Sequence, residues 1–374
     1  MTILASTKCR MAVLSCQFSA VSRQLSALGF LAFTGFFSTL LFAQSNSGMS
    51  DTAAPIPISS STIALRASST MNVVSEMGGA FMSSSKCDAD GNLYIRKFAM
   101  DRPLLGPVVK IDADGKRVAL FDPAAFSQLG IERADAFSPA SDGGLYQIAQ
   151  SGGLKPRIYV LHYSSDGSAA APALLDADFE VYTFAAFAGG NFLVSGVRRD
   201  AQNKDDHGRN FTAVFSADGR ELAQLSFDDV AGRGKAGRKG QLKFAAPALD
   251  LSEAEVGGDG YLYVMRPSSP ALVYAIAPSG KIMETLKVAA PLAGAMPNAF
   301  HVSENRLAIV FSQDENQGPA VVVADAQTGE KVARYAAAVA LGTSFACFSA
   351  NDGVFTFLKL GEGNALEVVR AEAQ

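Results

Sequence analysis

Four residues with the side chains of a ligand site occupy comparable places along the chain. Asp135, Glu253 and Asn298 each lie just ahead of a short strand-forming run, and His301 follows three residues after Asn298. Two acids and an amide supply the hard oxygen ligands that bind a divalent cation such as calcium. If these segments converge around a central channel, the side chains line its mouth and could bind a ligand there. Polar residues on a solvated rim are the alternative.

The tetrapeptide DADG occurs at 88–91 and again at 112–115. A calcium loop of the EF-hand type needs three alternating ligands before the glycine and a glutamate six residues after it. Each DADG offers two carboxylates and lacks that glutamate. Elsewhere only Asp-Gly recurs, as at 166–167 and 218–219. Asp-Gly provides the positive φ of tight turns, so the pattern predicts hairpin turns.

A basic, glycine-rich stretch, GRGKAGRKGQLK, occupies residues 232–243. It lacks the lysine and hydroxyl residue that follow the last glycine of a phosphate-binding loop. We interpret it as a surface loop in which Arg233, Lys235, Arg238 and Lys239 could dock an anionic partner. A solvated loop without a partner is the alternative.

The remaining candidate nucleophiles and metal ligands have no partner at a useful spacing. Ser195 lacks the flanking glycines of a nucleophile elbow, so the sequence predicts no hydrolase triad. His162, His207 and His301 are far apart and lack the spacing of a zinc site.

Cys87 and Cys347 are the two cysteines that lie beyond the N-terminal 43 residues. They precede the first turns of the first and last repeats described below, so a closing disulfide is one interpretation. Cys347 is one residue out of step with Cys87, which suggests that the two side chains face opposite ways. Two buried small residues are therefore the favoured interpretation.

The elements that position these residues recur along the chain. Six segments begin at a turn, continue into an aliphatic or aromatic strand and reach a second strand; they start at residues 90, 142, 189, 259, 304 and 352. A fixed period of roughly fifty residues indicates a propeller or solenoid. Further strand-like runs before the first turn and after the second give four short strands per repeat, the pattern of a propeller blade.

The sequence predicts an all-β, six-bladed β-propeller of four-stranded blades over residues 60–374. The last repeat stops after its third strand, and the run STIALRASS at 61–69 precedes the first repeat. We expect this N-terminal strand to pair in the last blade and close the ring. The motifs VVKIDADGKRVALF (108–121) and DGYLYVMRP (259–267) resemble those of six-bladed NHL-repeat and TolB-like proteins.

The predicted ligand residues also resemble, loosely, the acid-and-amide metal site of gluconolactonase-like propellers. That resemblance implies a metal ion that polarises a lactone carbonyl and activates water. A metal-dependent hydrolase using Asp135, Glu253 and Asn298 is thus the alternative function.

The N-terminus has the order of a secretory signal. Residues 25–43 carry no charge, and Lys8, Arg10 and Arg23 precede them. We predict a signal peptide at 1–43, a linker at 44–59, and a periplasmic or extracellular protein. The segment would hold the chain at a membrane only if it stays uncleaved.

Removal of residues 1–43 leaves 29 basic against 36 acidic residues. This balance disfavours nucleic-acid binding. We expect a monomeric, non-enzymatic binding or scaffolding protein that recognises a protein or small ligand at one face of the ring. We expect no resident cofactor; a divalent cation such as calcium in the channel is the alternative.

Overall fold

The computed structural model describes residues 62–374 apart from 79, 176–178, 199–207, 226–248, 250, 252, 313–317, 343 and 362–364. The predicted signal peptide and linker therefore lie outside the described residues. Within the described ranges, no helix is both long enough and apolar enough to cross a membrane.

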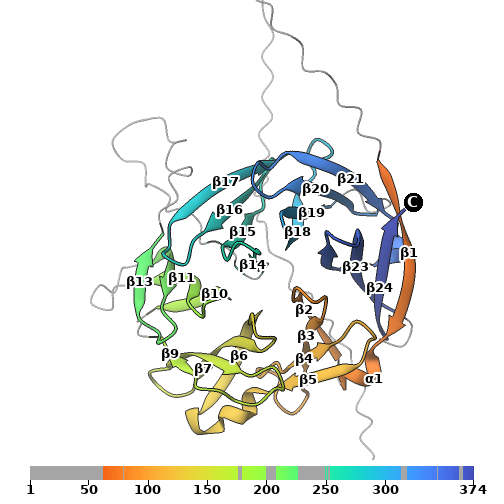
Figure 1. Cartoon of the computed structure of the whole chain (residues 1–374). Helices are drawn as coiled ribbons and strands as arrows, with labels where there is room; N and C mark the ends of the chain where they lie inside the picture. The colour runs from red at the N-terminus through yellow and green to blue at the C-terminus, as the bar shows by residue number, and fades with distance from the viewer. Residues whose placement is uncertain are drawn as a thin grey trace, which may run out of the picture. The chain divides into compact units, whose positions relative to one another are not determined.

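Four antiparallel sheets follow one another along the chain (Figure 1), and each takes its four strands in chain order. The strands of the first two sheets are β2 (Ala80–Cys87), β3 (Leu93–Phe98), β4 (Val108–Ile111) and β5 (Arg117–Phe121), then β6 (Ile131–Pro139), β7 (Leu145–Ser151), β8 (Ile158–Tyr163) and β9 (Ala173–Leu174). Those of the next two are β10 (Glu180–Ala186), β11 (Phe192–Arg198), β12 (Arg209–Phe215) and β13 (Glu221–Gln224), then β14 (Glu255–Val256), β15 (Leu262–Arg266), β16 (Ala271–Ile276) and β17 (Ile282–Val288).

The remaining strands form one eight-stranded sheet that joins two groups of four. One group is β18 (Pro297–Ser303), β19 (Arg306–Phe311), β20 (Ala320–Asp325) and β21 (Lys331–Ala337); the other is β22 (Ser344–Ser349), β23 (Val354–Leu360), β24 (Leu366–Ala373) and β1 (Ile63–Asn72). Helical turns are short: α1 (Val74–Met77), η1 (Pro123–Leu129) and η2 (Val339–Leu341).

The N-terminal strand completes the C-terminal group, which confirms the predicted pairing of residues 61–69. β1 runs antiparallel to β24, from Leu65 opposite Ala373 to Asn72 opposite Glu367. It also pairs in parallel with β21 over three residue pairs, and this contact merges the two groups into one sheet. The fold is thus an all-β, propeller-like arrangement of four-stranded units.

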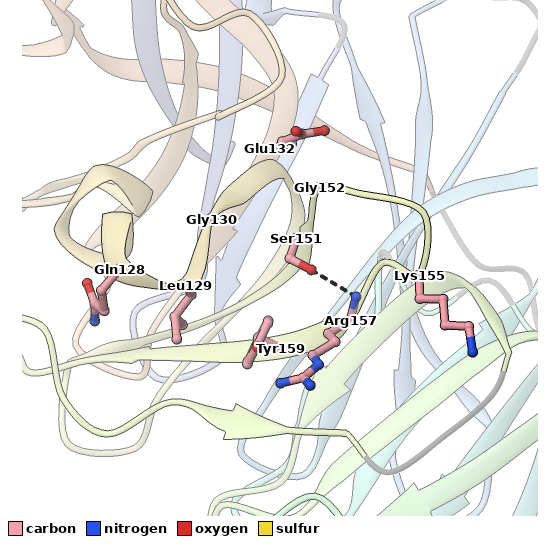
Figure 2. Close-up of a pocket in the computed structure, with 9 residues that line it drawn as sticks. All are labelled: Gln128, Leu129, Gly130, Glu132, Ser151, Gly152, Lys155, Arg157 and Tyr159. Atoms are coloured by element: carbon pink, nitrogen blue, oxygen red, sulfur yellow. Dashed lines mark hydrogen bonds between the residues drawn. The ribbon is translucent and has the colours of Figure 1, made fainter.

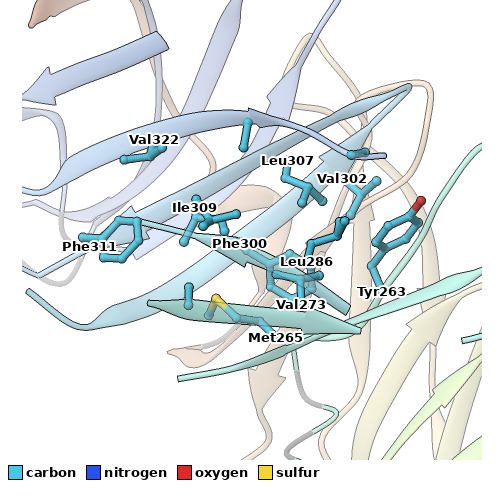
Figure 3. Packing of buried hydrophobic residues seen from close by; sticks show 14 of the residues in the cluster. Tyr263, Met265, Val273, Leu286, Phe300, Val302, Leu307, Ile309, Phe311 and Val322 are labelled. Carbon is cyan, nitrogen blue, oxygen red and sulfur yellow. The ribbon is translucent and has the colours of Figure 1, made fainter. Parts of the chain in front are cut away.

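Alternating residues bury both faces of each sheet against its neighbours. In β3, Leu93 and Ile95 pack with Leu358 of β23, whereas Tyr94 between them packs with Leu145 of β7. Figure 3 shows the corresponding layer between β14–β17 and β18–β21. Because strand side chains alternate between two faces, sheets buried on both sides need a near-continuous apolar run.

The Asp-Gly pairs form turns, as predicted. Gly91 and Gly115 have φ values of 77° and 80°, in the region that favours glycine. The carboxylate of Asp88 accepts hydrogen bonds from the backbone N–H groups of Asp90 and Asn92. Asp112 closes the second DADG turn in the same way. Both of these carboxylates are therefore engaged within their own turns.

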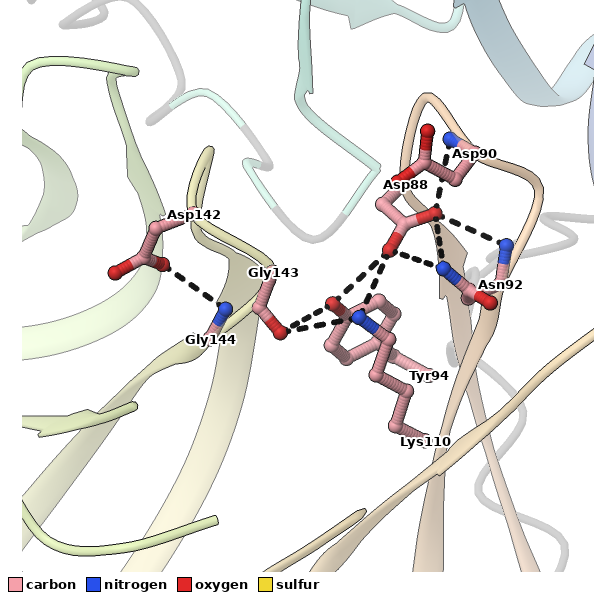
Figure 4. A network of polar contacts seen from close by, with 8 residues as sticks. All are labelled: Asp88, Asp90, Asn92, Tyr94, Lys110, Asp142, Gly143 and Gly144. Carbon is pink, nitrogen blue, oxygen red and sulfur yellow. Dashed lines mark hydrogen bonds and ion pairs between the residues drawn. The ribbon is translucent and has the colours of Figure 1, made fainter. Parts of the chain in front are cut away.

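Asp88 also joins the first sheet to the second (Figure 4). Its carboxylate lies 3.2 Å from the Lys110 ammonium and 3.1 Å from the Tyr94 hydroxyl. Both partners also contact the carbonyl of Gly143, in the turn between β6 and β7. Burial, followed by the nearby Asp88 carboxylate, raises the pKa of Tyr94 and keeps its phenol protonated.

A disulfide joins Cys87 of β2 to Cys347 of β22, with their Cα atoms 6.0 Å apart. The favoured prediction of two unpaired buried cysteines is therefore wrong. The bond spans 260 residues and ties the first group of strands to the last.

The error lay in how the one-residue offset was interpreted. Cys87 pairs with Leu93, whereas the corresponding pair in the last group is Phe348 with Phe355, one residue beyond Cys347. Each sheet turns opposite faces to its two neighbours. Two side chains that meet between neighbouring sheets must therefore come from opposite faces of their own sheets. Such positions differ by one residue in strand register, as Cys87 and Cys347 do, so this difference permits the disulfide.

Replacing both cysteines, as Cys87→Ala with Cys347→Ala, should lower the free energy of unfolding by about 2–4 kcal/mol, because the long loop is no longer closed in the unfolded chain. Urea denaturation measures this. Dithiothreitol should destabilise the wild type and leave the double variant unchanged. Free thiols at Cys87 and Cys347, located by mass spectrometry of peptides from the oxidised protein, would contradict the assignment.

The two DADG turns provide a matched pair of substitutions. Asp88→Ala should cost about 3 kcal/mol, because it leaves the buried Lys110 ammonium without its counter-ion. Asp112→Ala removes only turn hydrogen bonds and should cost about 1 kcal/mol. Equal losses in parallel urea titrations would show that the Asp88–Lys110 contact contributes little.

Candidate functional site

One position in the innermost strands gathers polar side chains. In β3, for example, Leu93 is the first buried residue, and Tyr94, which follows it, pairs with Lys86 of the innermost strand β2. We call Lys86, and the residue at the corresponding place in each of the other innermost strands, the inner position. Its six occupants are Lys86, Ser138, Ala185, Glu255, His301 and Cys347. All six are buried. Four of them are polar or charged, which is unusual for side chains so far from solvent.

Lys86 links two groups that are not neighbours in the chain order. Its ammonium donates a hydrogen bond of 2.7 Å to the carbonyl of Ala254, directly before β14. Figure 1 shows β2 and β14 on different sides of the space among the innermost strands. The Lys86 side chain therefore crosses that central space and joins the first and fourth sheets.

His301 and Glu255 form a second contact between groups. Nδ1 of His301 lies 3.4 Å from Oε2 of Glu255, and the two side chains are only 8% and 11% exposed. An amine, an imidazole and a carboxylate could in principle perform acid–base chemistry. Their burial leaves little surface for a substrate, so we assign Lys86, Glu255 and His301 to holding the innermost strands together.

The other residues predicted to line the mouth have separate environments. Asp135 of β6 forms ion pairs with Arg96 of β3, at 3.3 Å, and with Arg133. Burial lowers the pKa of Arg96, and Asp135 opposes that shift, so the carboxylate stabilises a largely buried guanidinium. Nδ2 of Asn298 donates to Oγ of Ser312 at 2.9 Å.

Glu253 is exposed, and the buried glutamate is Glu255, two residues further along. Counting back from the turn at residues 257–260 by strand register would have identified Glu255. Within the described part of the chain, no three His, Cys, Asp or Glu side chains are placed to hold a metal ion. Arg233, Lys235, Arg238 and Lys239 lie outside the described residues.

The connections between strands divide between two ends of the sheets. The connections from the first strand to the second and from the third to the fourth lie at one end, and most are turns of up to five residues; we call this end the turn face. The connections from the second strand to the third lie at the other end, together with those that lead from the outer strand to the next group; we call this end the loop face. Asp88 and Asp112 belong to the turn face.

Exposed large apolar side chains are distributed unequally between these ends. Met100 and Leu104 lie between β3 and β4, Leu154 lies between β7 and β8, and Leu292 precedes β18. Met100 is 90% exposed and Leu154 is fully exposed. Among the described residues, none of the exposed large hydrophobic side chains lies in a short turn of the turn face.

A polar pocket of about 620 Å³ opens on the loop face (Figure 2). The connection from β7 to β8 lines part of it and also carries Leu154. The pocket lies between the end of η1, the start of β6 and the connection from β7 to β8. Its lining residues are Gln128, Leu129, Gly130, Glu132, Ser151, Gly152, Lys155, Arg157 and Tyr159. The volume is in the range of small-molecule sites, roughly 300–1,000 Å³.

No protein-family model and no curated protein matches this chain. Among solved structures, it is similar to the β-propeller domain of the Trilobed protease from Pyrococcus furiosus, with 10% identity, a TM-score of 0.41 and coverage of 79% of this chain and 83% of that one. It is also similar to the Dos1 propeller, with 11% identity, a TM-score of 0.39 and 78% coverage of each chain.

A third similar structure is AztD from Citrobacter koseri, with 9% identity and a TM-score of 0.41. That match covers 74% of this chain and 67% of AztD. These similarities concern the propeller arrangement of strands, and at this level of identity they transfer no function.

Lys86→Met should lower the free energy of unfolding by about 1–3 kcal/mol, because the buried Ala254 carbonyl loses its donor. Lys359→Met is the control: it removes an exposed ion pair with Glu367 and should change stability by less than about 1 kcal/mol. Urea denaturation compares the two. Equal stability of Lys86→Met and wild type would contradict a structural role for the hydrogen bond from Lys86 to Ala254.

Proposed function

We propose that this chain is an exported, six-bladed β-propeller that acts as a non-enzymatic binding module. In this proposal a protein partner docks on the loop face through the exposed apolar side chains. The single observation that carries the proposal is the confinement of Met100, Leu104 and Leu154 to that face, while the polar residues of the centre are buried.

The blade count follows from treating the eight-stranded sheet as two blades joined at their outer strands. β21 and β1 share only three residue pairs, whereas β1 and β24 share seven. Six apolar clusters lie between successive groups of four strands, one for each interface of a six-membered ring. Both observations support six blades.

Export is supported by two features of different origin. Residues 25–43 have the uncharged, apolar character of a signal sequence and follow basic residues. Cys87 and Cys347 form a disulfide, and such bonds persist mainly in oxidising compartments. A periplasmic or extracellular location accounts for both.

Met100 is 90% exposed and Leu154 is fully exposed. Burial of such apolar side chains against a partner is favourable, so a protein is the partner that we propose. The alternative of a metal-dependent hydrolase has less support. A cation at Asp135 would have to compete with the guanidinium groups of Arg96 and Arg133 for the same carboxylate.

Site-specific photocrosslinking in cells that export the protein tests the docking face. A crosslinker at Leu154, on the loop face, should give a discrete adduct with a partner protein. A crosslinker at Leu222, an equally apolar residue on the outer strand β13, should give none. Met100→Ser together with Leu104→Ser should reduce the Leu154 adduct about tenfold, since hot-spot contacts dominate binding.

Val118→Ser with Val332→Ser is the matched control, because both residues are exposed on outer strands. This pair should leave the adduct unchanged. Adducts of equal strength at Leu154 and Leu222, or loss of the adduct in the control pair, would refute docking on the loop face.

A further inference from the structure

We propose that the loop-face pocket beside β6–β9 binds a small hydroxylated carboxylate, such as a uronic acid. The pocket shares the β7–β8 connection with Leu154, but the inference itself does not depend on the docking of a protein partner. The inference rests on how the pocket is built and on which charges it leaves available.

The two walls of the pocket are fixed by hydrogen bonds. The N–H of Gly152 donates to the carbonyl of Gly130, at 3.0 Å, and so joins the β7–β8 connection to the end of η1. Asp122 caps the start of η1 and forms a bidentate contact with Arg102. Burial opposes ionisation of Asp122, but the hydrogen bonds from Arg102 and Ala124 outweigh it and lower its pKa.

Arg157 is presented from a rigid backbone. Its N–H donates to Oγ of Ser151 at 2.9 Å, and its carbonyl accepts from the Ser151 N–H at 2.9 Å. Figure 2 shows its side chain turned toward Tyr159, whereas Lys155 points away. Within the described residues, neither Arg157 nor Lys155 forms an ion pair. A planar carboxylate matches the guanidinium fork of Arg157.

The other polar groups favour a ligand with hydroxyls. Gln128 offers an exposed amide, and Ser151 keeps its hydroxyl hydrogen free to donate after accepting from Arg157. Glu132 lies so close to Gly152 that a Cβ there would overlap its carboxylate. Because Glu132 accepts hydrogen bonds and repels anions, it favours a hydroxylated monocarboxylate over a dianionic phosphate.

Binding of D-glucuronate to the full chain, followed by calorimetry or by NMR chemical shifts, tests the site. We expect saturable binding that is about tenfold tighter than that of glucose or inorganic phosphate, since a bidentate ionic contact distinguishes the carboxylate. Arg157→Gln should weaken glucuronate binding about tenfold by loss of that contact. Arg220→Gln, which removes an exposed guanidinium from the turn face, should leave it unchanged.

Glu132→Gln provides a second variant, independent of Arg157. It should strengthen phosphate binding several-fold, because the repelling charge is gone. The proposal is overturned if glucuronate and glucose bind equally, if Arg157→Gln binds glucuronate like the wild type, or if no saturable binding occurs in the millimolar range. Persistence of the Leu154 photoadduct in Arg157→Gln would separate this site from protein docking.

Discussion

The burial of both faces of every sheet is the constraint on which this structure depends. A four-stranded unit with two apolar faces is stable only when a neighbour covers each face. The first and last units must therefore meet, because otherwise one face of each would contact water. Pairing of β1 with β24 and the disulfide between β2 and β22 both secure that junction.

The same constraint explains the chemistry of the centre. Side chains at the inner position face away from the preceding unit. They therefore pack against the following unit, as Ala185 and Cys347 do, or reach into the central space. Lys86 donates a hydrogen bond to the carbonyl of Ala254 in another unit, and His301 lies 3.4 Å from the carboxylate of Glu255 in the preceding unit. Buried polar groups that are paired in this way can specify which strands meet, whereas purely apolar residues would permit more arrangements.

The two ends of the sheets have different roles because their connections differ. The turn face includes tight turns such as the DADG turns, in which Asp88 and Asp112 accept backbone hydrogen bonds and Asp88 also pairs with Lys110. The loop face carries the connections that lead to the next unit, the exposed side chains of Met100, Leu104 and Leu154, and the pocket beside Arg157. Function on a rigid scaffold is usually found in such connections.

The sequence alone determined the repeat, the strands, the Asp-Gly turns and the pairing of the N-terminal strand, because each depends on local patterns or on an unpaired edge. Tertiary structure decided which side chains meet: Cys87 with Cys347, His301 with Glu255, and Asp135 with its two arginines. A one-residue slip reverses the face of a strand residue, and neighbouring sheets present opposite faces, so counting along the chain cannot assign these contacts.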